Sequence, residues 1–169
     1  MTSKRQDRPP VTTLVAQMLP NPYLIQWERV LRWRTRCASA VAHDAGFEAF
    51  DFLFALFASV LQMRDWLMAS RRDLQEEVAA LFRASENLGL ARDLANGSKH
   101  MVITSCSADG AATIAREYWG QGRFRYVVPR PSGRNVEALA LADACIRQLR
   151  DFMAQKGLSL DTRELDPRI

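Results

Sequence analysis

Cysteine and histidine are scarce in this chain of 169 residues, which contains three cysteines and two histidines. Cys37, Cys106 and Cys145 form no C-x-x-C pair, and with the two scattered histidines they match no zinc-ligand spacing. Their odd number provides no disulfide framework. No glycine-rich phosphate loop, Ser-His-Asp set or Cys-His nucleophile pair can be assembled either. We therefore expect free thiols in a reducing compartment, no bound metal and no cofactor.

The hydrophobicity pattern of the sequence also predicts neither a secretory signal peptide nor a membrane span. The first ten residues, MTSKRQDRPP, lack the apolar core of a signal peptide. The most apolar run, from Phe47 to Val60, is interrupted by Glu48 and Asp51 and is shorter than the roughly 20 residues that cross a bilayer. We therefore predict a cytoplasmic protein with no membrane partner.

The composition is that of an ordinary globular protein, with 48% apolar and 25% charged residues. A net charge of +4 permits contact with nucleic acid or an anionic surface without requiring it. Of the 23 basic residues, 20 are arginine. Two explanations stay open, phosphate binding and the base composition of the genome.

Hydrophobic residues recur at helical spacing in five stretches of the chain. The predicted helices cover residues 23–43, 47–70, 71–85, 86–102 and 136–156. The first is expected to close near Gly46, and Gly157 is expected just past the end of the last.

Between the last two helices, two stretches rich in β-branched and aromatic residues flank the tripeptide GQG, which predicts a β-hairpin at about 111–129. The expected fold is mainly α, a bundle of four to five helices with a small β-hairpin before the C-terminal helix. It forms one domain over residues 21–157, and residues 1–20 and 158–169 are predicted to be tails.

The helix predicted at 47–70 carries a stripe of small and polar residues on one line. Its members are Asp51, Ala55, Ala58, Gln62 and Asp65. Either a neighbouring helix approaches this stripe and its polar side chains find partners, or the stripe faces water.

The stretch ARDLANGSKH, residues 91–100, concentrates polar side chains next to an apolar helix side. If it is helical, Asp93, Asn96 and His100 fall within about 60° of one another, and Arg92 and Lys99 flank them. Histidine transfers protons near neutral pH, and basic side chains stabilise a phosphorane transition state. This group can therefore catalyse metal-independent RNA cleavage, with the 2′-hydroxyl as nucleophile.

In this hypothesis His100 transfers the proton, and the carboxylate of Asp93, Asp65 or Asp51 orients its ring. Arg92, Asn96 and Lys99 bind the phosphate. A homodimer would bring two histidines together as acid and base. Alternatively, the basic pair complements the helix dipole while Asp93 and Asn96 face water, or the motif forms an internal polar network in a non-catalytic interaction module.

A resemblance extends this hypothesis. The order of MRDWL at 63–67, DLANGSKH at 93–100, a hairpin and a final helix resembles bacterial and phage proteins that share a D-x-x-N-x-x-K-H pattern after a D-W pair. Over residues 47–156, the chain is similar to the HEPN superfamily. The resemblance implies a dimeric helical domain that binds RNA, an endoribonuclease of a toxin or phage-defence type, and a protein partner such as an antitoxin.

In that family pattern, Asp65, Trp66 and Asp51 would support the site. One feature departs from it. HEPN ribonucleases carry Arg, four to six residues and then His, whereas seven residues separate Arg92 from His100 here.

Two further basic segments are candidates for phosphate contact. Arg29, Arg32 and Arg36 share one face of the first helix, which either tracks a phosphate backbone or is simply solvated. The segment GQGRFRY mixes basic and aromatic residues, which suits base stacking with phosphate contact and is equally typical of a half-exposed strand.

Overall fold

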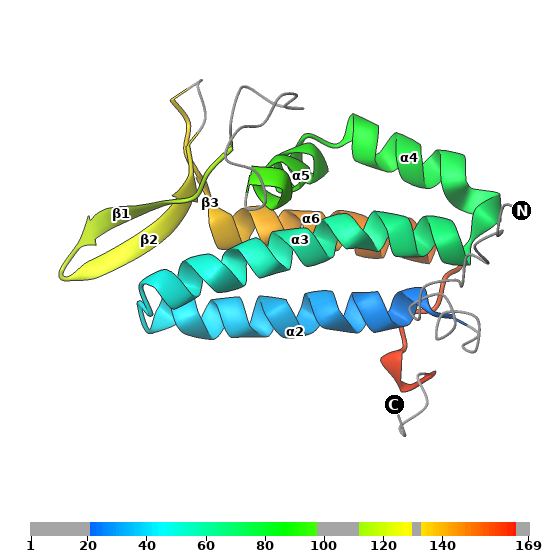
Figure 1. Cartoon of the computed structure of the whole chain (residues 1–169), viewed down its shortest axis with the longest axis horizontal. Helices are drawn as coiled ribbons and strands as arrows, with labels where there is room; N and C mark the ends of the chain where they lie inside the picture. Colours follow the sequence, from blue (N-terminus) through cyan, green and yellow to red (C-terminus); the bar gives the residue numbers. More distant parts are fainter. Residues whose placement is uncertain (1–20, 98–111, 130–132, 165–169) are drawn as a thin grey trace, which may run out of the picture.

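The computed structural model describes residues 21–97, 112–129 and 133–164 (Figure 1). Within these ranges the fold is mainly α, with five helices and a small antiparallel sheet before the last one, which confirms the predicted fold class. The helices are α2 (Tyr23–Ala42), α3 (Phe47–Ser70), α4 (Gln75–Ala84), α5 (Glu86–Gly97) and α6 (Ala138–Gln155). The short elements are η1 (Arg72–Leu74), β1 (Ala115–Gly120), β2 (Arg123–Val128), β3 (Val136–Glu137) and η2 (Thr162–Glu164).

Helix α3 is the centre of the bundle and packs against α2, α4, α5 and α6. In Figure 1, α2 runs along one side of α3, α4 and α5 lie along the other, and α6 lies behind. Leu53, Leu56, Phe57 and Val60 of α3 are completely buried. This position explains its composition, since a helix with neighbours on several sides must be apolar around most of its circumference.

Helix α3 has the predicted bounds, residues 47–70, but its apolar stretch is longer than the run from Phe47 to Val60 on which the membrane prediction rested. Among the helices that the structure describes, α3 alone is long and apolar enough to cross a membrane. A core helix meets the same criterion, and 39% of the most apolar window of α3 is buried inside the protein. The length of the apolar run therefore does not exclude a membrane span, and the absence of a membrane partner stays a prediction.

The turn between α2 and α3 forms around Asp44, which has a left-handed backbone with φ +49°. The amide of Ala45 donates to the carbonyl of Ala40 at 2.9 Å, and that of Asp44 donates to Val41 at 3.2 Å. This pair of bonds is the Schellman helix end. The helix thus ends a few residues before Gly46, which has φ +60° and directly precedes α3.

The predicted hairpin is confirmed, and a third strand joins it. In the antiparallel β1–β2 pair, Arg116 lies opposite Tyr126 and Tyr118 lies opposite Phe124. The connecting residues Gly120, Gln121 and Gly122 all have positive φ, which explains the two glycines. Strand β3 pairs with β2 but is only two residues long, too short to give an alternating sequence pattern.

The sheet is anchored on the turn between α2 and α3. The hydroxyl of buried Tyr126 donates to the carbonyl of Gly46 at 3.2 Å, and its ring packs edge-on against Phe50 at 5.1 Å. The guanidinium of Arg116 forms a two-bond ion pair with the carboxylate of Asp44. Burial raises the pKa of Tyr126, and the neighbouring charge of Asp44 acts in the same direction.

Helix α6 ends at Gln155, and Gly157, with φ +64°, lies just past this end as predicted. The amide of Leu158 donates to the carbonyl of Met153 at 2.9 Å. The packed chain continues beyond the predicted boundary at residue 157. Leu158 is buried, and the hydroxyl of Tyr23 donates to the carbonyl of Ser159 at 3.3 Å.

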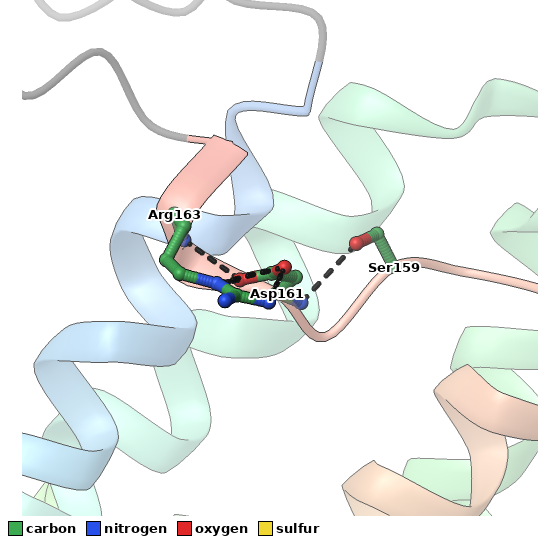
Figure 2. A network of polar contacts seen from close by, with 3 residues as sticks. All are labelled: Ser159, Asp161 and Arg163. Atoms are coloured by element: carbon green, nitrogen blue, oxygen red, sulfur yellow. Dashed lines mark hydrogen bonds and ion pairs between the residues drawn. The ribbon is translucent and has the colours of Figure 1, made fainter.

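Local polar contacts shape the chain after Ser159 (Figure 2). The amide of Asp161 donates to the hydroxyl of Ser159 at 3.2 Å, and the amide of Arg163 donates to the Asp161 carboxylate at 3.0 Å. The Arg163 side chain pairs with the same carboxylate and holds the pKa of Asp161 down at about 2. The first residues of the expected C-terminal tail are therefore an ordered part of the fold, and η2 packs against α2.

Candidate nucleic-acid interface

Helix α5 carries the first half of the D-x-x-N-x-x-K-H motif. The side chain of Asp93 is only 1% exposed, and the side chain of Asn96 is half-buried. The Nε atom of Arg92 lies 3.6 Å from Oδ1 of Asp93. The interpretation in which Asp93 faces water is therefore wrong. Lys99 and His100 lie outside the described residues, so their roles stay predictions.

Two of the three α3 residues that were expected to support this motif lie on the exposed side of the helix. Helices α3 and α5 pack together, yet Asp51 and Asp65 are both exposed. Trp66 is half-buried and packs against the core. Each interpretation therefore holds for part of the stripe. Asp51 and Asp65 face water, whereas the side chain of Gln62 accepts a hydrogen bond from Gln26 of α2 at 3.4 Å. Whether either carboxylate reaches His100 depends on a residue outside the described ranges.

The three arginines of α2 are engaged within their own helix. Arg29 donates to the side-chain oxygen of buried Gln26 at 2.8 Å, and Arg32 pairs with Glu28 at 2.7 Å. The guanidinium of Arg36 lies 4.9 Å from the ring centre of Trp33. Arg32 and Arg36 are exposed and stay available for phosphate contact, whereas Arg29 supports the fold.

An ion pair that no sequence pattern indicated joins α2 to α6. Arg34 donates two hydrogen bonds to the carboxylate of Asp143, at 2.6 and 2.9 Å. These bonds raise the pKa of Arg34. The two residues are 109 positions apart, and no local pattern relates them.

Three large apolar side chains are strongly exposed on the described surface. Phe47 is 88% exposed, Tyr118 is 65% exposed and Trp119 is 61% exposed. Tyr118 and Trp119 are consecutive residues of β1, which projects with β2 from one end of the bundle (Figure 1). Because exposed aromatic residues cost solvation free energy, a pair at the tip of a hairpin suggests a binding surface.

Arginine side chains stack on these aromatic rings. The guanidinium of Arg125 lies 3.9 Å from the ring centre of Trp119, and that of Arg116 lies 3.5 Å from the ring centre of Phe124. Tyr118 packs edge-on against Phe124 at 5.6 Å. We call this strand pair, Ala115–Gly120 with Arg123–Val128, the aromatic-basic hairpin.

The charges of the aromatic-basic hairpin are partly balanced. Arg125 pairs with Glu117 at 2.8 Å, and Asn135 donates a hydrogen bond to the same carboxylate. Arg123 is exposed near the tip and donates to the side chain of Gln121 at 3.3 Å. Between residues 115 and 128, three arginines and one glutamate leave a net charge of +2.

The chemistry of the remaining candidates is limited. Cys37 and Cys145 are free and buried, and burial raises the pKa of each thiol to about 12, so neither is a nucleophile at neutral pH. His43 caps α2, with Nδ1 at 2.7 Å from the carbonyl of Ser39. In the part of the chain that is described, no three His, Cys, Asp or Glu side chains are grouped to hold a metal ion.

The sequence matches no protein-family model, and no curated protein and no solved structure is significantly similar to it. The residues themselves carry the functional interpretation.

Proposed function

We propose that this protein binds single-stranded RNA through the aromatic-basic hairpin. The observation that carries the proposal is the exposed ring of Trp119, stacked on the guanidinium of Arg125 and adjacent to exposed Tyr118. Proteins that bind single strands combine aromatic platforms, on which bases stack, with basic groups that follow the phosphates. RNA is the nucleic acid that the HEPN resemblance implies.

The arrangement assigns a role to each side chain. The face of Trp119 that Arg125 does not cover receives a base, and Tyr118 offers a second ring on the other side of the strand. Arg123 supplies a cation for the neighbouring phosphate, since its hydrogen bond to neutral Gln121 leaves its charge uncompensated by that partner. Stacking tolerates any base, so we expect little sequence preference.

The test is fluorescence anisotropy of a labelled oligouridine with the wild type and Trp119→Ala. Base stacking contributes about 1–3 kcal/mol, so the variant is expected to bind roughly 5- to 150-fold more weakly. Affinity should also fall as salt increases. Phe47→Ala removes an exposed ring outside the hairpin, and Arg72→Gln removes an exposed charge outside it. Equal losses in these controls, or unchanged binding by Trp119→Ala, would refute the proposal.

The burial of Asp93 favours a second candidate role, a structural one, for the motif in α5. A buried carboxylate beside a guanidinium is costly to disturb, because removing one partner leaves the other charge without compensation. If the motif is structural, Asp93→Asn is expected to lower the melting temperature, and neither the wild type nor any variant is expected to cleave RNA. Wild type, Asp93→Asn and His100→Ala should be incubated with total RNA in EDTA and melted in parallel.

Cleavage by the wild type but not by His100→Ala, with unchanged melting, would instead establish the metal-independent ribonuclease. Homodimerisation and a protein partner such as an antitoxin stay predictions of the resemblance.

A further inference from the structure

A pocket of about 350 Å³ lies at the bend between α4 and α5. Its walls include Phe82, Arg83, Ser85, Glu86, Gly89 and Arg92. Figure 1 shows this bend on the side of α3 opposite α2, and the hairpin projects from one end of the bundle. The volume falls within the range of small-molecule sites, roughly 300–1,000 Å³.

Two arginines line this pocket, and their ion pairs are long. The Nη2 atom of Arg83 is 4.0 Å from Glu76, and Nε of Arg92 is 3.6 Å from Asp93. Both separations exceed hydrogen-bond range, so these pairs do not engage the N–H donors of either guanidinium. By contrast, Arg34 donates two hydrogen bonds to the carboxylate of Asp143, at 2.6 and 2.9 Å.

The other walls are fixed in place. The hydroxyl of Ser85 accepts a hydrogen bond from the amide of Leu88 at 3.1 Å and donates to the side chain of Gln148 at 2.6 Å. These bonds hold the bend against α6, so the spacing of α4 and α5 at the pocket is set by the fold. Phe82 is 7% exposed and supplies an apolar wall.

We propose that this pocket binds a phosphate monoester. Guanidinium groups are matched to phosphate oxygens by their planar arrays of donors, and two of them offset the charge of a dianion. The carboxylate of Glu86 at the wall disfavours a second phosphate, which selects a monoester over a polyphosphate. The site goes beyond the proposed RNA surface and does not depend on it.

The experiment is a titration followed by two-dimensional amide NMR, with inorganic phosphate, AMP and sulfate as separate probes. Phosphate and AMP are expected to shift the amides of Ser85, Gly89 and Arg92. Arg83→Gln is expected to weaken binding roughly ten- to hundredfold, the effect of losing a hydrogen bond to a charged group. Arg72→Gln, an exposed arginine outside the pocket, is the matched control and should bind as the wild type does.

Two sources of the monoester are distinguished by comparing oligouridine with a 5′-phosphate and with a 5′-hydroxyl. A pocket shift with the phosphorylated strand but not with AMP assigns the site to an RNA end, and a shift with AMP assigns it to a free phosphate ester. Arg92→Gln is a second variant that removes a pocket guanidinium, but Arg92 adjoins buried Asp93 and its loss can unfold the protein. Arg83→Gln tests the pocket without disturbing this pair.

No shift at these amides with any phosphate probe would overturn the proposal. Equal affinity for sulfate, or an equal loss in Arg72→Gln, would do so too, since either result describes general anion attraction. Trp119→Ala should leave phosphate binding intact, so this site and the RNA surface can fail separately.

Discussion

Because two thiols are buried, those of Cys37 and Cys145, we predict that the fold loses stability at alkaline pH. Burial raises the pKa of Cys37 and Cys145 from 9.0 to about 12, and the charge of Arg34 offsets part of the effect on Cys37. In the unfolded chain the thiols ionise near pH 9, whereas in the folded protein they stay protonated. The unfolded state therefore binds fewer protons above pH 9, and stability falls as pH rises toward 12.

The size of the effect follows from the pKa shift. One pH unit of differential ionisation corresponds to about 1.4 kcal/mol per group. At pH 10, which is one unit above the unfolded pKa, each thiol removes roughly 1.4 kcal/mol of the free energy of unfolding, and the pair about 3 kcal/mol. Below the unfolded pKa of about 9, the thiols are protonated in both states and this loss of stability is absent.

Urea denaturation at pH 8 and pH 10 measures this drop. We expect Cys145→Ala to lose stability at both pH values, because it leaves a cavity, but to show a drop smaller by about 1.4 kcal/mol. Cys37→Ala should behave in the same way. In the double variant, the decrease in the free energy of unfolding between pH 8 and pH 10 should be smaller by about 3 kcal/mol than in the wild type. An identical drop in the wild type and the double variant would refute the assignment of alkaline sensitivity to these thiols.

Three further substitutions test the contacts that position the helices and the hairpin. Gln26→Leu removes the buried amide that donates to Ser59 O at 2.8 Å and should cost about 1–3 kcal/mol in urea denaturation, whereas unchanged stability would show that this contact contributes little. Tyr126→Phe removes the bond to Gly46 and should cost about 1 kcal/mol while speeding amide exchange in β2; a rigid β2 would contradict the anchoring role. Gly46→Ala places a side chain at φ +60° and should lower stability by about 1–3 kcal/mol, and an unaltered melting temperature would exclude backbone strain there.

The helices and the hairpin could be predicted because their signals are local. Apolar residues at a period of 3.6 mark each helix, and GQG between two β-rich stretches marks the turn. Strand β3 could not be predicted, since its two residues are too few to show an alternating pattern and form a strand only through their pairing with β2. The ion pair between Arg34 and Asp143 is missed for a similar reason, because it depends on how α2 packs against α6.

The candidate site was predictable to a different extent in each segment. That Asp93 and Asn96 share one side of α5 follows from helical geometry, but this geometry does not show whether that side is buried or exposed to solvent. Asp93 is buried because of the helices around α5, and Asp51 and Asp65 are exposed because the neighbours of α3 leave those two positions uncovered. The hairpin was identified as basic and aromatic, whereas its large exposed rings, Tyr118 and Trp119, became evident only from the structure.

The aromatic-basic hairpin combines a fixed base with an exposed tip, and this contrast favours binding. Near the bundle, Tyr126 is buried against Phe50 and Arg116 is held by Asp44. Toward the tip, Arg125 lies on Trp119, so the ring is already restricted before a ligand arrives. A side chain that is ordered in advance loses less conformational entropy on binding. A hairpin that served only to cover the core would bury these rings, so their exposure on an anchored strand pair is the main structural support for the proposed RNA-binding surface.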